Sequence, residues 1–258
     1  MSIRVIAIIP ARMASSRFPG KPLKKICGLP MVEHVRRRTL LSGAFAEVFV
    51  ATCDEEIAQT VRHHGGQVVM TSVNHEAATD RVWEAAQSIP CSHVVNVQGD
   101  EILVLPADLK KMASSVRRHP AIPAWNALGP VGKESILRDH SVVKCIVSRT
   151  GRILFCTRDC SFLPRVDGRG LEPIRILLGI LGYRLDYLDR YAKLPRTPLE
   201  KVESIDQSRI IEHDGVLQGV PFSRGYMGIN YPDEVREVER LLASDRLQQK
   251  VLKKVLSQ

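Results

Sequence analysis

The sequence predicts an α/β fold, a Rossmann-like parallel sheet with helices on both faces. Short β-rich runs alternate with helical patterns four times between residues 5 and 118, and such alternation produces parallel strands joined by crossover helices. The chain of 258 residues is also long enough to bury a core without disulfide or metal staples. We therefore expect one domain, residues 1–258.

The first half consists of four consecutive β–α units. The expected strands are Val5–Ile9, Glu47–Thr52, Gln67–Thr71 and His93–Val97, and the expected helices are Met31–Leu41, Glu55–His64, Thr79–Ser88 and Pro106–Arg118. The first strand is an uninterrupted apolar run that ends at Pro10, as expected of a strand buried on both faces. Ligands of such sheets bind beyond the carboxyl ends of the strands.

The helix Met31–Leu41 is expected to be amphipathic. Its apolar residues Val32, Val35 and Leu40 should face the core, and its basic residues His34, Arg36 and Arg37 should face solvent.

The second half is less regular, and we expect it to complete the same sheet. The expected elements are strands at Val142–Val147, Ile153–Thr157 and Leu178–Leu185, helices at Pro198–His213 and Pro232–Ala243, and an amphipathic surface helix in the C-terminal sequence LQQKVLKKVLSQ.

Charge and composition narrow the class of protein. Lys and Arg number 37 against 28 Asp and Glu, a net charge of +9 that favours anionic partners. Six cysteines lack the spacing of metal ligands, which indicates free thiols in a reducing compartment. We find no apolar run of about 18 residues and no secretory leader pattern. We expect a cytoplasmic protein with no membrane partner.

The loop after the first strand carries the strongest functional signal. Residues 8–23 read IIPARMASSRFPGKPL. Gly20 allows a close approach of backbone to ligand, and the prolines stiffen the loop. Arg12, Arg17 and Lys21 supply positive charge, and Ser15 and Ser16 supply hydrogen-bond donors. This combination suits a triphosphate. The loop has neither GxxxxGK[ST] nor GxGxxG, which argues against ATPases and dehydrogenases.

Several motifs occur together in one order. They are PARMASSRFPGKPL, VATCDEEIAQTVRHHGGQVVMTSVNH, VNVQGDE, VVKCIVSRTGRILFCTR, LGILGYR, TPLEKVESIDQSR and MGINYPDEVREVERL. The set resembles the nucleotidyltransferases that make CMP-activated sugar acids, above all the 3-deoxy-manno-octulosonate (Kdo) cytidylyltransferases. The resemblance covers nearly the whole chain. It implies a nucleotide-diphospho-sugar transferase type of fold, with a nucleotide-binding half (1–135) and a half for the acceptor and dimerisation (136–258).

The resemblance also implies a reaction and a set of roles. CTP and an acidic acceptor, a Kdo-like sugar acid or a related acid, would give a CMP-linked product and pyrophosphate with Mg²⁺ as cofactor. Arg12, Lys21 and Asp100 would be catalytic, with Asp100 holding the metal. The nucleotide would contact Pro10, Ala11, Arg12, Ser15, Arg17, Lys21, Thr71, His75, Thr79, Arg81 and Gln98. The acceptor would contact Gln98, Arg158, Tyr183, Glu200, Glu203 and Gln207.

Three departures from the family pattern concern the base, the acceptor and the metal. Ala78 stands where the family has a glycine of the cytosine pocket. Ile176, Leu177 and Leu181 replace three polar residues of the acceptor site, although Arg175 could supply the missing cation. Asn230 replaces a second metal-binding carboxylate, and an amide oxygen can still bind Mg²⁺ but brings no charge.

These departures leave alternatives open. The acceptor could be a small phosphonate such as phosphonoformate, or the chain could be a weakly active paralogue that binds CTP in a regulatory role. A nucleic-acid partner is not expected, because aromatic residues make up only 5% and do not interleave with basic ones. The resemblance further implies a homodimer through residues near 140–190. The stretch Ile176–Leu181 could belong to that interface or to the acceptor pocket.

Overall fold

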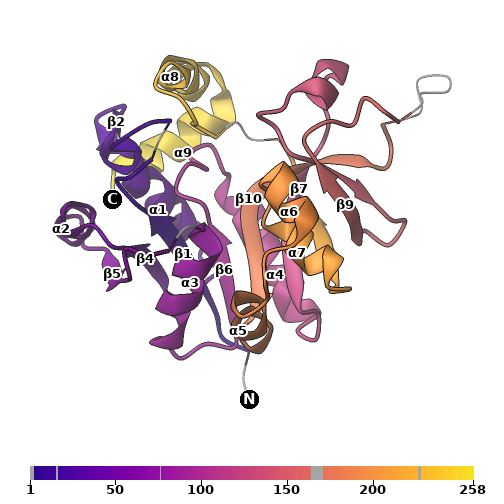
Figure 1. The fold of residues 1–258 in the computed structure, drawn as a ribbon. Helices are drawn as coiled ribbons and strands as arrows, with labels where there is room; N and C mark the ends of the chain where they lie inside the picture. Colours follow the sequence, from indigo (N-terminus) through magenta and orange to yellow (C-terminus); the bar gives the residue numbers. More distant parts are fainter. Residues whose placement is uncertain (1–2, 16, 76, 164–170, 226–227) are drawn as a thin grey trace.

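The computed structural model describes residues 3–15, 17–75, 77–163, 171–225 and 228–258. Seven strands of its main sheet lie side by side in the order β11-β7-β10-β6-β1-β4-β5, and β8 and β9 extend from β10 as an arm (Figure 1). The strands of the main sheet are β1 (Val5–Ala11), β4 (Val48–Thr52), β5 (Gln67–Met70), β6 (His93–Val97), β7 (Ala124–Gly129), β8 (Lys144–Val147), β9 (Ile153–Thr157), β10 (Ile174–Arg184) and β11 (Leu217–Pro221). A separate pair is formed by β2 (Lys25–Ile26) and β3 (Leu29–Pro30).

Helices cover both faces of the sheet, as the sequence predicts. They are α1 (Met31–Leu41), α2 (Glu55–His63), α3 (Ala78–Gln87), α4 (Pro106–Arg118), α5 (Leu185–Ala192), α6 (Pro198–Glu203), α7 (Gln207–Glu212), α8 (Glu234–Ser244) and α9 (Arg246–Leu256), with short 3-10 turns η1 (Lys21–Leu23) and η2 (Glu134–Arg138). Apolar residues of α1, α2 and α4 pack in one core cluster, and those of α3, α5 and α7 pack in another. The expected strands and helices of the first half are confirmed to within two residues at their ends.

The predicted parallel sheet is confirmed for the strands of the first half, and the second half adds antiparallel strands. β10 runs antiparallel between β6 and β7, so that Leu181 pairs with Asn96 on one side and with Asn126 on the other. A bulge interrupts its pairing with β7 between Leu177 and Leu181. β10 follows the arm in the chain; it pairs antiparallel with β8, and β8 pairs antiparallel with β9. β7 and β11 were not expected, because their sequences AWNALG and LQGVP contain the weak strand formers Asn, Gly and Pro.

The prediction that the basic side of α1 faces solvent is wrong. His34, Arg36 and Arg37 are buried, whereas Leu40 is exposed. The reason is a second layer outside α1: the Arg37 guanidinium donates to the Val255 carbonyl of α9. The buried carboxylate of Glu33 accepts hydrogen bonds from both Arg36 and Arg37, so each of these buried charges has a partner.

The single helix expected over Pro198–His213 is two helices, α6 and α7. Ser204 adopts a left-handed conformation (φ 53°) between them and ends α6. The C-terminal helix α9 is confirmed as amphipathic, with Val255 buried and Lys253 and Lys254 exposed. Among the described residues, no helix combines the length and apolarity that a membrane span requires.

Candidate active site

The loops that follow β1 and β6 meet at one edge of the sheet. The two strands are direct parallel neighbours, so their carboxyl ends lie together. A side chain at Gly99 would place its Cβ 3.0 Å from the Pro10 carbonyl oxygen, which shows how closely the two loops approach. Across this contact, Lys21 Nζ donates to Asp100 Oδ2 and to the Ile229 carbonyl, both at 2.8 Å. Two of the residues predicted to be catalytic are therefore an ion pair.

The loop that follows β1, called the basic loop below (residues 12–23), is held by hydrogen bonds within its own backbone and by one carboxylate distant in the sequence. The amides of Ser15 and Gly20 both donate to the Met13 carbonyl, at 2.9 and 3.1 Å. Gly20 has φ 72°, a left-handed conformation that favours glycine. The Met13 amide donates to Asp54 Oδ2 at 2.8 Å. Asp54 thus ties the loop to the end of β4.

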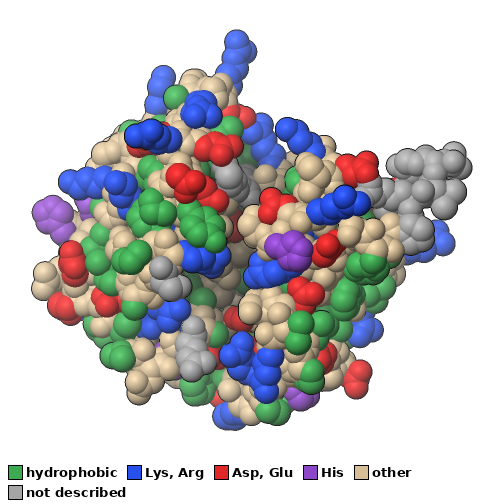
Figure 2. Space-filling model, turned by 45° about the horizontal axis from the view of Figure 1, so that its top comes forward, with side chains coloured by type: hydrophobic (Ala, Val, Ile, Leu, Met, Phe, Trp, Pro, Cys, Tyr) green, Lys and Arg blue, Asp and Glu red, His purple; other side chains and the backbone are tan. Residues whose placement is uncertain are grey.

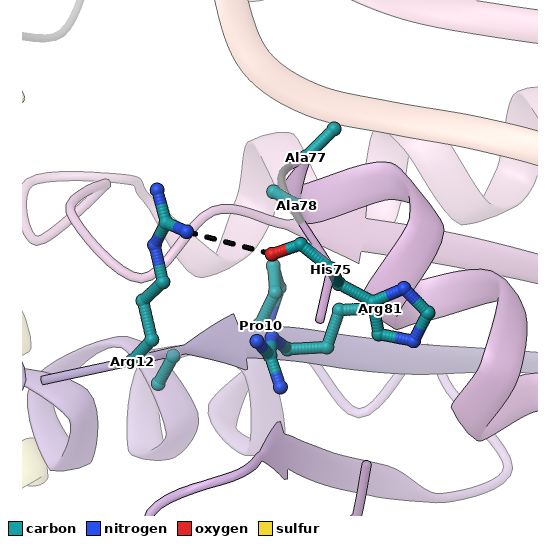
Figure 3. Close-up of a pocket in the computed structure, with 7 residues that line it drawn as sticks. Pro10, Arg12, His75, Ala77, Ala78 and Arg81 are labelled. Carbon is teal, nitrogen blue, oxygen red and sulfur yellow. Dashed lines mark hydrogen bonds between the residues drawn. The ribbon is translucent and has the colours of Figure 1, made fainter. Parts of the chain in front are cut away.

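A small pocket of about 110 Å³ lies beside this loop (Figure 3). Its lining consists of Pro10, Ala11, Arg12, His75, Ala77, Ala78 and Arg81. The Arg12 guanidinium reaches across to the His75 carbonyl at 3.5 Å. The His75 ring turns away from Arg12 and contacts the carboxylate of Glu84. His75 therefore presents its backbone to Arg12.

Arg81 is buried and organises the wall of this pocket. Its guanidinium donates to the Thr71 hydroxyl and to the Ser72 carbonyl. Glu84 accepts from the Ser72 amide at 2.8 Å. Although partial burial opposes ionisation, the hydrogen bonds from Ser72 and His75 hold the pKa of Glu84 below its usual value. The network fixes the segment from Thr71 to His75.

A larger cleft of about 530 Å³ adjoins the Lys21–Asp100 pair. The predicted site residues that line it are Arg17, Thr79, Gln98, Asp100, Arg158, Gln207 and Asn230. Figure 2 shows this side of the molecule hollowed, with Lys, Arg, Asp and Glu side chains gathered along the margins. Predicted site residues from both halves of the chain therefore line one cleft.

Glu101 forms part of the cleft wall and is almost fully buried. Its Oε1 accepts from the Gly179 amide of β10 at 2.7 Å, and its Oε2 has no partner among the described residues. Burial and the adjacent Asp100 raise the pKa of Glu101 to about 8. The raised pKa favours the protonated form of Glu101, and its side chain joins the loop after β6 to β10.

Arg158 and Gln207 line the acceptor side of the cleft, and each is held by protein groups. The Arg158 guanidinium donates to the carbonyls of His140 and Glu203, at 2.7 and 2.8 Å. The Glu203 carboxylate accepts from the Arg158 amide, so Glu203 positions Arg158. Gln207 donates to the buried Asn126 of β7 at 3.0 Å.

Tyr183 and Glu200 do not lie where an acceptor contact would require. Both are 0% exposed. Glu200 pairs with Arg209 and caps its own helix at Thr197, which is a structural role. Tyr183 packs against Tyr191 with ring centroids 6.0 Å apart. Direct contact of either side chain with an acceptor is therefore excluded in this conformation. Ser15, Lys21, Thr71 and Glu203 also lie outside the linings of the pocket and the cleft. Ser16 lies outside the described residues.

Five of the six residues of Ile176–Leu181 belong to the cleft, and the interface role stays a prediction. Ile176, Leu177, Leu178, Gly179 and Leu181 line the cleft that contains Asp100. Arg175 does not replace the missing cation there, because its guanidinium donates to the carbonyls of Glu172 and Ile174 outside that lining.

Oxygen donors suited to Mg²⁺ are present in the cleft. A Cβ at Gly228 would lie 3.8 Å from Asp100 Cγ, which brings the segment that carries Asn230 against Asp100. Among the described residues, no three His, Cys, Asp or Glu gather into a metal site. Mg²⁺ needs no such cage, since it retains waters and binds substrate phosphates beside one or two carboxylates. The residues present fit this ion.

Two residues of the site were missed at the sequence level. Asp54 follows the strand β4, and the rule that ligands bind at strand ends could have identified it. Glu101 is the neighbour of Asp100 in the QGDE motif. Its contact with Gly179 depends on the unexpected position of β10 beside β6.

The chain is similar to cytidylyltransferases in both sequence and fold. The profile described as "Cytidylyltransferase" matches residues 6–217. The 3-deoxy-manno-octulosonate cytidylyltransferase of Myxococcus xanthus is 39% identical over 93% of this chain and 97% of its own, and that of Syntrophotalea carbinolica is 37% identical over 91% and 97%. The solved CMP:2-keto-3-deoxy-manno-octonic acid synthetase in complex with CTP has a TM-score of 0.88, with 32% identity over 94% of this chain and 99% of that chain. This chain therefore belongs to the cytidylyltransferase family.

Proposed function

We propose that this protein transfers the cytidylyl group of CTP to an acidic acceptor, a Kdo-like sugar acid or a related acid. An oxygen of the acceptor would attack the α-phosphorus, a new P–O bond would form, and the bond to the β-phosphate oxygen would break with release of pyrophosphate. The observation that carries the proposal is the Lys21–Asp100 pair, because it joins the basic loop to the cleft.

The nucleotide would occupy the edge of the sheet where the small pocket and the basic loop meet. The pocket beside Arg12 and Ala78 would receive the base, and the triphosphate would extend along the loop toward Lys21. Arg12, Arg17 and Lys21 offset the repulsion between two anionic reactants, which is the main obstacle to attack at phosphorus. Support comes from the similar solved synthetase, which was determined with CTP.

Asp100 and Asn230 would hold Mg²⁺. When bound, the ion would supply positive charge beside the α-phosphate oxygens. The Lys21 ammonium group, which has three N–H donors and contacts Asp100 and the Ile229 carbonyl, would also donate to the phosphates.

The test is pyrophosphate release from each of the four ribonucleoside triphosphates with Mg²⁺ and a panel of acids. We expect release with CTP together with an acid, and none without an acid. Release that is equal for CTP and ATP, or that proceeds without an acceptor, would contradict the proposal.

We also propose that the protein acts as a homodimer through residues near 140–190. Light scattering on the purified chain tests this, and a monomer at micromolar concentration would contradict it.

A further inference from the structure

The turn that carries Asp100 is fastened at both ends to one residue of β10. The turn covers residues 98–101 and is closed by a hydrogen bond from the Glu101 amide to the Gln98 carbonyl at 3.1 Å. At its start, the Gln98 amide donates to the Gly179 carbonyl at 2.9 Å. At its end, Glu101 Oε1 accepts from the Gly179 amide at 2.7 Å. We call these two bonds to Gly179 the clasp, because they hold the turn on both sides of Asp100.

The side chain of Glu101 replaces a main-chain acceptor in the clasp. The pairing of Ile180 with Val97 continues to Gly179 and Gln98, the next residues of β10 and of the chain after β6. Two residues that form a hydrogen-bonded pair in an antiparallel ladder exchange both N–H···O bonds. Here the Gln98 carbonyl accepts from the turn, and the Glu101 carboxyl group accepts from the Gly179 amide instead. The chain can therefore leave β6 in a tight turn while the Gly179 amide keeps a partner.

Gly179 leaves room for this contact because it has no side chain. A Cβ at this position would lie 2.8 Å from Glu101 Oε1 and 3.2 Å from Gln98 Cβ and Cδ, closer than ordinary van der Waals contact. The nearest atom is the end of a side chain, which can move. A methyl group here would therefore displace the Glu101 carboxyl group from the Gly179 amide.

The other carboxyl oxygen of Glu101 indicates that stability alone does not favour an acid at this position. Glu101 is 7% exposed, and its Oε2 has no hydrogen-bond partner among the described residues. A buried polar atom without a partner lowers the stability of the folded state. Gln98, Asp100, Glu101 and Gly179 all line the cleft, so the contact that Glu101 does make acts on the wall that carries Asp100.

We infer that Glu101 and Gly179 are positioning residues, which fix the turn and thereby hold the Asp100 carboxylate in place for Mg²⁺. The inference rests on the proposed function, in which Asp100 holds the ion. Neither residue lines the small pocket beside Arg12. Loss of the clasp should therefore weaken metal binding and slow the chemical step, with little effect on the binding of CTP.

The test compares variants that break the bond to Gly179 with one that keeps it. Glu101→Met removes the acceptor oxygen at similar side-chain length, Gly179→Ala displaces it, and Glu101→Gln retains it. Binding of Mn²⁺, a paramagnetic substitute for Mg²⁺, is measured by water proton relaxation with CTP present and no acceptor. The values of kcat and KM come from pyrophosphate release.

We expect Glu101→Met and Gly179→Ala to raise the dissociation constant of Mn²⁺ about tenfold and to lower kcat about ten- to a hundredfold. KM for CTP should change less than about threefold. Glu101→Gln should restore most of both losses, because its amide oxygen can accept from Gly179. The matched control is Gly132→Ala, since a Cβ at Gly132 would contact none of the described residues within 4 Å beyond its chain neighbours. This control should leave both quantities unchanged.

Unaltered Mn²⁺ affinity and kcat in Gly179→Ala would overturn the inference. A Glu101→Gln protein that is impaired as strongly as Glu101→Met would also overturn it, because the hydrogen bond would then not be the cause. If Glu101→Met does not fold, Gly179→Ala decides on the same measurements. Absence of pyrophosphate release with every acid would instead count against the proposed function, and the Mn²⁺ dissociation constants would still decide the role of the clasp.

Discussion

Lys21 and Asp100, separated by 79 residues in the chain, form an ion pair with Nζ and Oδ2 2.8 Å apart. Both side chains are mostly shielded from solvent, at 17% and 23% exposure. The Ile229 carbonyl is the second acceptor for the same ammonium group. Three segments that are distant in the sequence thus converge on one cation, at the point where the basic loop opens into the cleft.

Replacing Lys21 should impair the chemical step more than folding. Lys21→Ala removes a charge directed at the phosphates, and we expect kcat to fall by about 10²–10³ in a pyrophosphate-release assay. Lys24→Ala, which removes an exposed lysine of the same loop, is the control and should retain activity. Equal activity of the two variants would contradict the role given to Lys21.

Asp54 should act on nucleotide binding through the loop. Asp54→Ala frees the Met13 amide, and the loop then loses its tie to β4. A hydrogen bond to a charged group is worth about 1.5–3 kcal/mol, so KM for CTP should rise about ten- to a hundredfold while kcat changes less. The control is Glu55→Ala at the exposed neighbour. A fall confined to kcat would argue against a positioning role.

Lys144 should support the acceptor side of the cleft. It is 0% exposed, and its ammonium group donates to the carbonyls of Asp139, Val142 and Arg158. Lys144→Met leaves these carbonyls without their donor, and we expect the free energy of unfolding to fall by about 2–4 kcal/mol in urea denaturation. The exposed Lys133→Met is the control. A loss of less than about 0.5 kcal/mol for Lys144→Met would show that the three bonds add little.

Glu101 should make stability depend on pH. Its pKa is raised from 4.5 to about 8 in the folded protein, so the native state keeps a proton that the unfolded chain releases. The free energy of unfolding should therefore decrease as pH rises from about 4.5 to about 8, by at most about 1.4 kcal/mol per pH unit for this proton. Glu101→Gln, a neutral isostere, should remove that part of the slope. Parallel pH profiles for the two proteins would contradict the buried protonated state.

The sequence predicted the β–α units well because each is a local pattern: an apolar run, a turn and an amphipathic helix. The same logic placed Lys21 and Asp100 after strand ends, and the structure shows that these two strands, β1 and β6, are neighbours. Three features depend on contacts that no local pattern encodes. β7 and β11 are strands only because neighbouring strands complete their hydrogen bonds. The basic face of α1 is buried because α9 covers it.

The burial of Tyr183 and Glu200 also depends on contacts between residues that are distant in the sequence. Both match positions of the acceptor site in sequence, but long-range packing against Tyr191 and pairing with Arg209 bury them. Conversely, the position of Leu177 on the cleft lining follows only from the placement of β10 beside β6 and β7.

The most direct test of the account is pyrophosphate release from CTP, Mg²⁺ and an acidic acceptor by Asp100→Asn. The variant keeps the size of the side chain and removes its charge. We predict a fall in kcat of at least about a hundredfold, with an unchanged melting temperature and a weakened dependence on Mg²⁺ concentration. Unaltered turnover by a correctly folded Asp100→Asn protein would contradict cytidylyl transfer at this site.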